Sequence, residues 1–239
     1  RCRDSSLPCP FLCPLHIPRV LSFFKFSVWH LLSQAQMCYT GRMENYQKKL
    51  DRELEALGGR RPGLLLHSCC GPCSTYVLEY LSGYFSLGLL YYDPNIQPEA
   101  EYELRLENQR RVLAEFPEVR LHEYGWRGEE YDAAVRGLEA EPEGGARCTV
   151  CFRLRLEETA RLAAQLGYEY FCTTLSVSPH KDAERINRIG REMGEKYGVK
   201  WLPSDFKKRE GYKRSIELSR EFGLYRQDYC GCLYSKAGN

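Results

Sequence analysis

The sequence has no apolar run long enough to cross a lipid bilayer. The apolar stretch Val20–Leu32 is interrupted by Lys25 and is shorter than the ~20 residues that a membrane-spanning helix needs. A secretory signal would place its uncharged core here, but Arg19 and Lys25 interrupt that core and no small-x-small cleavage site follows it. We therefore expect no association with a membrane.

A basic excess is also missing from most of the chain. Residues 1–42 hold five of the 34 Lys and Arg residues and one of the 32 Asp and Glu residues, which leaves 29 bases and 31 acids in residues 43–239. The resulting formal charge of −2 excludes a protein-wide positive field that would attract nucleic acid. Any contact with RNA must therefore depend on a local basic patch.

Residues 1–42 differ in composition from the rest of the chain. Four prolines interrupt any helix between residues 8 and 18, whereas a helical pattern begins directly after Met43. We predict that residues 1–42 are a non-native or disordered leader without functional residues. Residues 43–239 are then expected to form a single catalytic domain.

The remaining residues alternate between strand-like and helix-like patterns. Short apolar runs predict strands at Leu64–His67, Leu87–Tyr92, Val119–Tyr124, Tyr168–Leu175 and Lys200–Leu202. Longer amphipathic segments predict helices at 44–58, Ser74–Leu81, Pro98–Phe116, Tyr131–Leu138, 150–166 and Pro179–Tyr197, with the last helix at Ser215–Phe222. This alternation predicts an α/β fold: a doubly wound, mostly parallel sheet of about five strands flanked by helices, Rossmann-like or HUP-like.

Cysteine and polar residues follow four of the predicted strands. In a parallel sheet the carboxyl ends of the strands meet at one edge, and ligands bind there. We expect the residues that follow the strands to share one site. They are Cys69, Cys70 and Cys73 after the first strand, Asp93 after the second, Thr173, Thr174 and Ser176 at the fourth, and Asp205 and Phe206 after the fifth.

Seven of the twelve cysteines lie in three short motifs. These are His67-Ser68-Cys69-Cys70-Gly71-Pro72-Cys73, Arg147-Cys148-Thr149-Val150-Cys151 and Tyr229-Cys230-Gly231-Cys232. Thiolates are soft ligands that favour zinc or iron–sulfur clusters, and a C-x-C can close a strained, easily reduced disulfide ring. Because the long helical and strand-like segments need no disulfides for stability, we expect a reduced, cytoplasmic protein that uses its thiols for metal binding or catalysis.

The spacing alone leaves two kinds of thiolate site open. Cys70 and Cys73 with Cys148 and Cys151 would make a four-cysteine zinc site. The 74 residues between the two pairs far exceed the roughly 15–20 of a zinc ribbon, and Cys69 is left over. An iron–sulfur cluster accommodates dispersed cysteines, because each can ligate a different iron.

A local RNA-binding patch is predicted after the fifth strand. Lys207, Lys208 and Arg209 follow Asp205 and precede Tyr212. Basic residues interleaved with an aromatic residue suit contacts to phosphates together with a stacked base.

Other candidate residues have ordinary structural explanations beside the functional one. His180 either contacts substrate or phosphate or begins a helix. Cys172, in the middle of a predicted strand, fits a small core residue. Two groups of arginines fit solvated helix surfaces: Arg153, Arg155 and Arg161, and Arg185, Arg188 and Arg191.

Six segments, in order along the chain, resemble the epoxyqueuosine reductases of the QueH type. Besides the first two cysteine motifs they are Tyr92-Asp93-Pro94-Asn95-Ile96, Thr173-Thr174-Leu175-Ser176-Val177-Ser178-Pro179-His180-Lys181, Asp205-Phe206-Lys207-Lys208 and Gly223-Leu224-Tyr225-Arg226-Gln227-Asp228-Tyr229-Cys230-Gly231-Cys232. The resemblance runs through residues 64–235 and leaves residues 1–42 outside.

The resemblance implies an activity and a set of cofactor residues. The activity is the reductive deoxygenation of epoxyqueuosine in a tRNA anticodon to queuosine, with an electron donor that the sequence does not identify. The implied ligands of a [4Fe-4S] cluster are Cys69, Cys70, Cys148 and Cys151. Cys73 would then hold an adjacent iron or zinc ion, and Cys230 and Cys232 would form a redox-active disulfide.

The chemistry of the implied reaction agrees with these residues. Removing an epoxide oxygen as water needs two electrons and two protons. A thiol pair can store two electrons, and a Lewis-acid metal can stabilise the alkoxide as the C–O bond breaks. Asp93 and Asp205 are candidate proton donors or supporting groups.

Two other classes of protein remain as alternatives. The first is a zinc-stabilised RNA-binding module without catalysis. The second is a thiolation or nucleotidyl-transfer enzyme on a related α/β scaffold. The second class usually has a Ser- and Gly-rich phosphate loop after the first strand, where this chain has Cys69-Cys70-Gly71-Pro72-Cys73.

Overall fold

The computed structural model describes residues 44–236, which contain one five-stranded parallel sheet. The strand order is β3-β2-β1-β4-β5. The strands are β1 (Gly63–His67), β2 (Ser86–Tyr91), β3 (Arg120–Glu123), β4 (Tyr170–Thr173) and β5 (Lys200–Trp201). All four pairings are parallel. From β1 the chain builds outward first to β2 and β3 on one side and then to β4 and β5 on the other, and such sheets bind ligands at the switch point beside β1.

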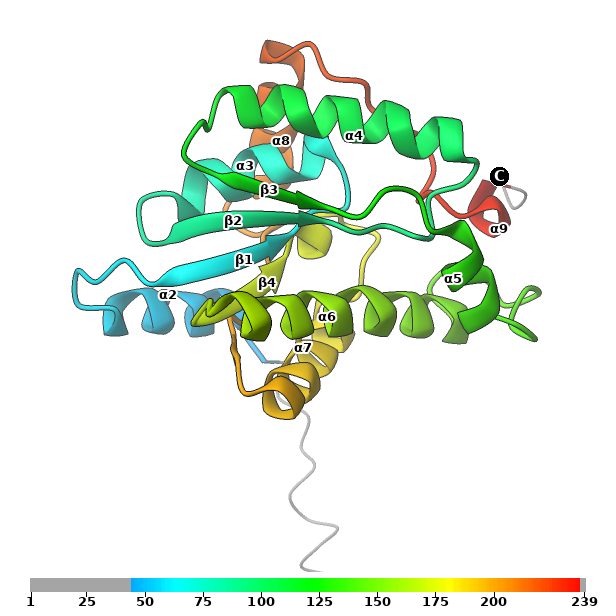
Figure 1. Ribbon diagram of the computed structural model, residues 1–239. Coiled ribbons are helices and arrows are strands. Elements are labelled where there is room, and N and C mark those ends of the chain that lie inside the picture. Colours follow the sequence, from blue (N-terminus) through cyan, green and yellow to red (C-terminus); the bar gives the residue numbers. More distant parts are fainter. Residues whose placement is uncertain (1–43, 237–239) are drawn as a thin grey trace, which may run out of the picture. The chain divides into compact units, whose positions relative to one another are not determined.

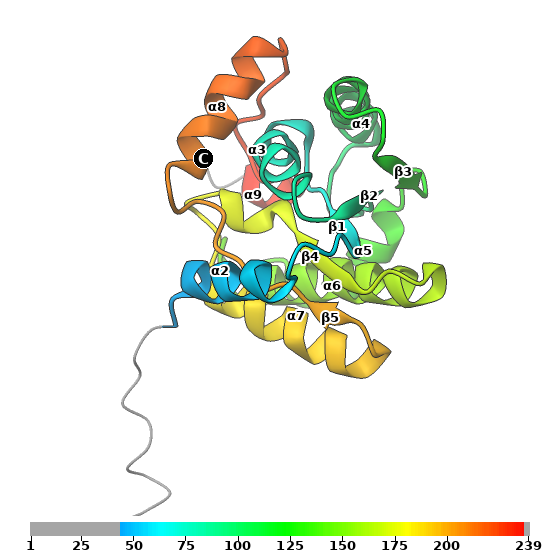
Figure 2. The ribbon, with the colours of Figure 1, turned by 90° about the vertical axis from the view of Figure 1, so that its left-hand side faces the viewer.

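The helices cover both faces of the sheet (Figures 1 and 2). They are α2 (Tyr46–Ala56), α3 (Gly71–Leu81), α4 (Glu99–Ala114), α5 (Gly128–Ala134), α6 (Ala146–Leu166), α7 (Ala183–Tyr197), α8 (Gly211–Glu221) and α9 (Leu233–Lys236), with a 3-10 turn η1 (Thr174–Val177). Helices α3 and α4 lie on one face with α8 against α3, while α2, α6 and α7 lie on the other. The apolar strand residues Leu64, Leu65 and Leu66 are fully buried between these layers.

The predicted fold class is confirmed, and all five predicted strands exist. The fourth strand is shorter than predicted, because the chain turns into η1 at Thr174, where the Thr173 side chain accepts a hydrogen bond from the Leu175 amide. Helix α7 begins at Ala183 rather than at Pro179, because Asp182 caps it by accepting a hydrogen bond from the Arg185 amide. The helix predicted at Ser215–Phe222 exists as α8 but begins at Gly211, and it is not the last helix, since α9 follows it.

The largest corrections concern where two helices begin. Helix α3 begins at Gly71 and α6 at Ala146, so two of the cysteine motifs lie in or beside first helical turns rather than in preceding loops. Pro72 suits this position, because its missing amide proton would have no partner in the first turn. No helix among residues 44–236 is long and apolar enough to span a bilayer. The predicted leader lies outside the described residues.

Candidate functional site

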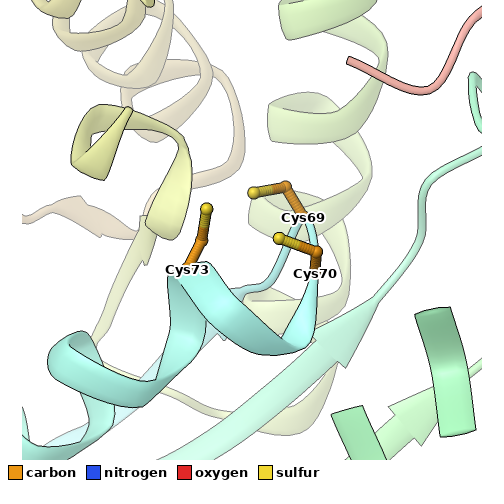
Figure 3. A group of neighbouring side chains, drawn as sticks. All are labelled: Cys69, Cys70 and Cys73. Carbon is orange, nitrogen blue, oxygen red and sulfur yellow. The ribbon is translucent and has the colours of Figure 1, made fainter. Parts of the chain in front are cut away.

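Three cysteines converge where β1 ends and α3 begins. Cys69 and Cys70 follow β1, and Cys73 lies in the first turn of α3. Their Sγ atoms lie within 4.8 Å of one another, and Figure 3 shows the three side chains pointing into a common space. We call Cys69, Cys70 and Cys73 the thiol trio. Its arrangement suits the binding of a soft metal ion or cluster.

Neighbouring elements fix the position of the trio. The Cys69 amide donates to Thr174 Oγ1 (3.1 Å), and that hydroxyl donates to Cys69 Sγ (3.3 Å). Gly71 packs so closely on α4 that a Cβ atom there would lie 2.9 Å from the Asn108 carbonyl oxygen. The switch point and the α3–α4 packing therefore hold the three thiols together.

The three thiols share negative charge unequally. Hydrogen bonds from Cys69 and Cys73 lower the pKa of Cys70 well below its usual range, with a smaller contribution from the Gln227 side chain. Hydrogen bonds with Cys69 and Cys70 raise the pKa of Cys73, and the hydrogen bond with Cys70 raises the pKa of Cys69 to about 11. One thiolate is thus stabilised by two thiols, and full deprotonation of the trio requires a positive charge such as a metal.

The C-x-x-C motif lies in the first two turns of α6. Cys148 Sγ accepts a hydrogen bond from the Gly144 amide (3.2 Å), and Cys151 Sγ accepts one from Arg155 Nη2 (3.2 Å). Arg155 also donates to the Cys151 carbonyl oxygen (3.2 Å), so it contacts both the backbone and the side chain of Cys151. The α6 N-terminus adds the positive end of a helix dipole to this environment.

A buried charged network links the C-x-x-C motif to the sheet. Arg155 Nη1 lies 3.1 Å from Asp93 Oδ1, and the same oxygen lies 3.5 Å from His67 Nε2. His67 Nδ1 lies 2.8 Å from Thr173 Oγ1, which completes a path from α6 through β2 and β1 to β4. The interpretation of Arg155 as a solvated surface residue was wrong, since it is only 2% exposed. Its spacing of four residues from Cys151 on one helix was the available signal.

The two cysteines of the C-x-C motif occupy different environments. Cys230 is partly exposed and its Sγ accepts a hydrogen bond from Lys181 Nζ (3.1 Å). Cys232 is buried in a small cluster with Tyr131, Val135 and Cys151. We call Cys230 and Cys232 the C-x-C pair. Both are free thiols here, as are all the cysteines of residues 44–236, so their disulfide stays a prediction.

Burial and local donors act differently on the pair. Burial raises the pKa of Cys230, against the opposing effect of Lys181 and Arg155. Burial also acts to raise the pKa of Cys232, but hydrogen bonds from Ser235 and Tyr131 outweigh it and leave the pKa lowered. Cys172 lies on β4 as predicted, fully buried, and burial raises the pKa of its thiol.

A cavity of about 610 Å³ joins these groups at the carboxyl end of the sheet. Its volume suits a ligand the size of a nucleoside. Residues of the trio, the C-x-C pair and α6 reach it, together with charged and aromatic side chains. The lining includes Cys69, Cys73, Glu143, Arg155, His180, Lys181, Tyr212, Arg226, Gln227, Asp228, Tyr229 and Cys230.

Sequence reasoning found part of this lining. His180 and Tyr212 line the cavity, whereas the predicted proton donors Asp93 and Asp205 do not. Asp93 is buried against Arg155. Lys181 and Gln227 were missed as individual residues, although both lie inside the segments that carried the family resemblance.

The predicted basic patch is largely paired with acids. Lys207 Nζ lies 2.6 Å from Asp205 Oδ1, and Arg209 Nη2 lies 2.6 Å from Asp51 Oδ2. Lys208 is exposed. The patch thus carries less net positive charge than its sequence suggests, and its role in RNA binding stays a prediction.

Comparison with known proteins decides the family. The family model described as "Epoxyqueuosine reductase QueH" matches residues 64–238. The chain belongs to the epoxyqueuosine reductase QueH family. A protein of that name from Streptococcus pyogenes serotype M1 is 46% identical over 180 residues, which cover 73% of this chain and 71% of the relative. Another from Staphylococcus epidermidis is 41% identical over 207 residues, covering 81% and 87%.

Solved structures add a more distant likeness. The U34-tRNA thiolase NcsA from Methanococcus maripaludis, solved with its [4Fe-4S] cluster, has a TM-score of 0.48 and 12% identity. The match covers 80% of this chain and 67% of that chain. A likeness at this level carries no inference about function.

Proposed function

We propose that this protein deoxygenates epoxyqueuosine in a tRNA anticodon to queuosine, as a cytoplasmic oxidoreductase that takes electrons from a separate donor. Family membership supports the reductase activity. The observation that carries the assignment to this site is the cavity itself, because Cys69 and Cys73 of the trio and Cys230 of the C-x-C pair line one nucleoside-sized space at the switch point.

The softness of the cysteine donors supports an iron–sulfur cluster, and the three sulfurs of the trio lie within 4.8 Å of one another. We assign Cys69, Cys70, Cys148 and Cys151 as its ligands, and Cys73 as the residue that holds an adjacent iron or zinc ion. Three of the four proposed ligand sulfurs accept hydrogen bonds from Thr174, Gly144 and Arg155 respectively. Such hydrogen bonds orient thiolate ligands and adjust reduction potentials. When bound, these metals supply single electrons and polarise the substrate oxygen.

The remaining lining residues bind and orient the substrate. Tyr212 and Tyr229 offer aromatic faces for a base, and Arg226 and His180 offer donors for phosphate or hydroxyl groups. Lys181 carries a proton at Nζ inside the cavity, where charge on Cys230 and the hydrogen bond that Lys181 donates to Glu143 oppose the effect of burial and raise its pKa. Asp93 holds Arg155 in place, and we assign it a supporting role rather than direct proton donation.

A single-turnover experiment tests the proposed function. Anaerobically purified protein, reduced with dithionite, is mixed with a substoichiometric amount of tRNA that carries epoxyqueuosine. We expect conversion to queuosine, detected in digested tRNA by mass spectrometry as the loss of one oxygen atom. Unchanged epoxyqueuosine with a fully metal-loaded protein would contradict the proposal. The zinc-stabilised module without catalysis also predicts no conversion, and family membership does not favour it.

A further inference from the structure

The two sulfurs of the C-x-C pair differ in access. Cys230 lines the 610 Å³ cavity, whereas Cys232 is only 5% exposed and packs against Tyr131 and Cys151. Thiol–disulfide exchange requires an attacking thiolate to reach a disulfide sulfur along an open path. Of this pair, the cavity offers that path to Cys230.

Lys181 places a positive charge at the accessible sulfur. Its Nζ lies 3.1 Å from Cys230 Sγ and 2.7 Å from Glu143 Oε1, and its side chain is only 10% exposed. An ammonium group held between a carboxylate and a sulfur stabilises negative charge on that sulfur more than a mobile surface lysine does. Lys181 is therefore a positioning residue that acts through Cys230.

The backbone around Cys230 is held in place from the other side. Arg105, a buried residue of α4, donates to the carbonyl oxygens of Tyr229 (3.4 Å) and Cys230 (3.3 Å). The Gln97 amide donates to the Gly231 carbonyl oxygen (2.9 Å). Gly231 has φ +128°, a conformation that L side chains rarely adopt, which lets the chain direct the two sulfurs into different environments.

We propose that Cys230 is the sulfur that exchanges with an external dithiol, with Lys181 beside it, and that Cys232 is the leaving sulfur. The inference rests on the proposed redox role of the pair. A thiolate of the external dithiol attacks Cys230 Sγ, the Cys230–Cys232 bond breaks, and its electron pair leaves on Cys232 Sγ. The second external thiol then attacks the external sulfur of the mixed disulfide and releases Cys230 as a thiolate next to Lys181. The external dithiol is oxidised to a disulfide by two electrons, and its two protons end on the Cys230 and Cys232 thiols.

Competitive alkylation tests the assignment without substrate. Reduced, metal-loaded protein is treated with limiting iodoacetamide, and fragment ions of the peptide 227–236 assign the label to Cys230 or Cys232. Because Cys230 lines the cavity and Cys232 is buried, we expect Cys230 to react at least about tenfold faster, although its own pKa is raised and that of Cys232 is lowered. Lys181→Ala should slow Cys230 severalfold and Lys181→Arg should restore much of the rate, while Lys213→Ala, an exposed lysine of α8, should change nothing. Equal rates, or faster labelling of Cys232, would overturn the assignment.

Trapping tests the exchange itself. The oxidised wild-type protein is mixed with a thioredoxin whose second active-site cysteine is replaced by serine, so that the mixed disulfide cannot resolve. We expect the thioredoxin to be attached at Cys230, and attachment at Cys232 would contradict the proposal. Single turnover with dithionite bypasses this exchange. Conversion of substrate together with trapping at Cys232 would therefore refute the inference alone, whereas trapping at Cys230 without conversion would refute the proposed function alone.

Discussion

The thiol trio and the C-x-C pair differ in what the protein places around their sulfurs. The donors outside the trio that contact its sulfurs directly are neutral, namely the Thr174 hydroxyl and the Gln227 amide group. At the C-x-C pair, Lys181 Nζ lies directly against Cys230 Sγ. Thiolates with no protein cation in direct contact need a metal to balance their charge, whereas a lysine in contact with a sulfur offsets part of the charge of a thiolate there. The difference supports the proposed binding of a metal by the trio and the proposed thiol exchange at the pair.

Arg155 is close to both the thiol trio and the C-x-C pair. It donates to Cys151, pairs with Asp93 and lines the same cavity as Cys69 and Cys230. Its charge therefore acts on both sets of thiols, which makes the buried network a connection between them.

Loss of iron is the largest effect that the comparison predicts. Cys69→Ala, Cys70→Ala, Cys148→Ala and Cys151→Ala should each lose bound iron and the brown absorbance, because each removes a proposed ligand thiolate. Cys230→Ser and Cys232→Ser should keep both, and so should the core control Cys172→Ala. Iron analysis and the visible spectrum measure the outcome. If a C-x-C variant loses its iron, the division between the trio and the pair is wrong.

Removing the buried arginine should have the next largest effect. Arg155→Met leaves the buried Asp93 without its arginine partner and with only His67 at 3.5 Å, which should lower the free energy of unfolding by about 3–5 kcal/mol. The double variant Arg155→Met with Asp93→Asn should recover part of this loss. Denaturant unfolding provides the measurement.

Arg153→Met is the matched control, on the same helix. Arg153 forms an exposed pair with Glu192 (2.6 Å), which should contribute less than about 1 kcal/mol. Equal losses for Arg153→Met and Arg155→Met would show that the buried network has no special role in stability.

Gly231→Ala should disturb the C-x-C pair while sparing the trio. A Cβ atom at this positive φ would lie 3.1 Å from Asn95 Nδ2 and 3.2 Å from Arg105 Nη1, so we expect a loss of about 1–3 kcal/mol. Iron content should be unchanged, and labelling of Cys230 should slow. Gly83→Ala, with nothing within 4 Å of the added atom, should be nearly neutral. Wild-type stability and labelling of the Gly231→Ala protein would show that the backbone conformation at Gly231 is not needed to position the two sulfurs.

The sequence was sufficient to predict the fold and the site's position. Strand–helix alternation gave all five strands, and strand order brought Cys69, Asp93, Thr174 and Asp205 to the same end of the sheet. The individual contacts were not predictable. Arg155 on α6 has the sequence surroundings of a surface arginine, and only the packing of α6 against the sheet shows that it is buried.

Two further site features depended on tertiary pairing. Lys181 and Cys230 are separated by 49 positions, and no periodicity relates them. The ion pairs of Lys207 with Asp205 and of Arg209 with Asp51 likewise appear only in the fold, and they reduce the charge of a patch that looked strongly basic.

The smallest effect is expected at this basic patch. Replacing Lys207, Lys208 and Arg209 by Glu should weaken tRNA binding and flatten its salt dependence, because fewer phosphates are neutralised. Since two of these residues are already paired with acids, the change in slope should be smaller than for three unpaired cations. A salt titration of tRNA affinity measures it. Unaltered binding would show that tRNA binds elsewhere, and Arg185, Arg188 and Arg191 on α7 would be the next residues to replace.

The most direct test of the account is an iron and acid-labile sulfide analysis of protein purified without oxygen. The account predicts iron and sulfide in similar amounts, about four of each per chain plus any adjacent metal ion. Stoichiometric zinc with no sulfide would contradict the account, and the cysteines would then be the ligands of a structural zinc site.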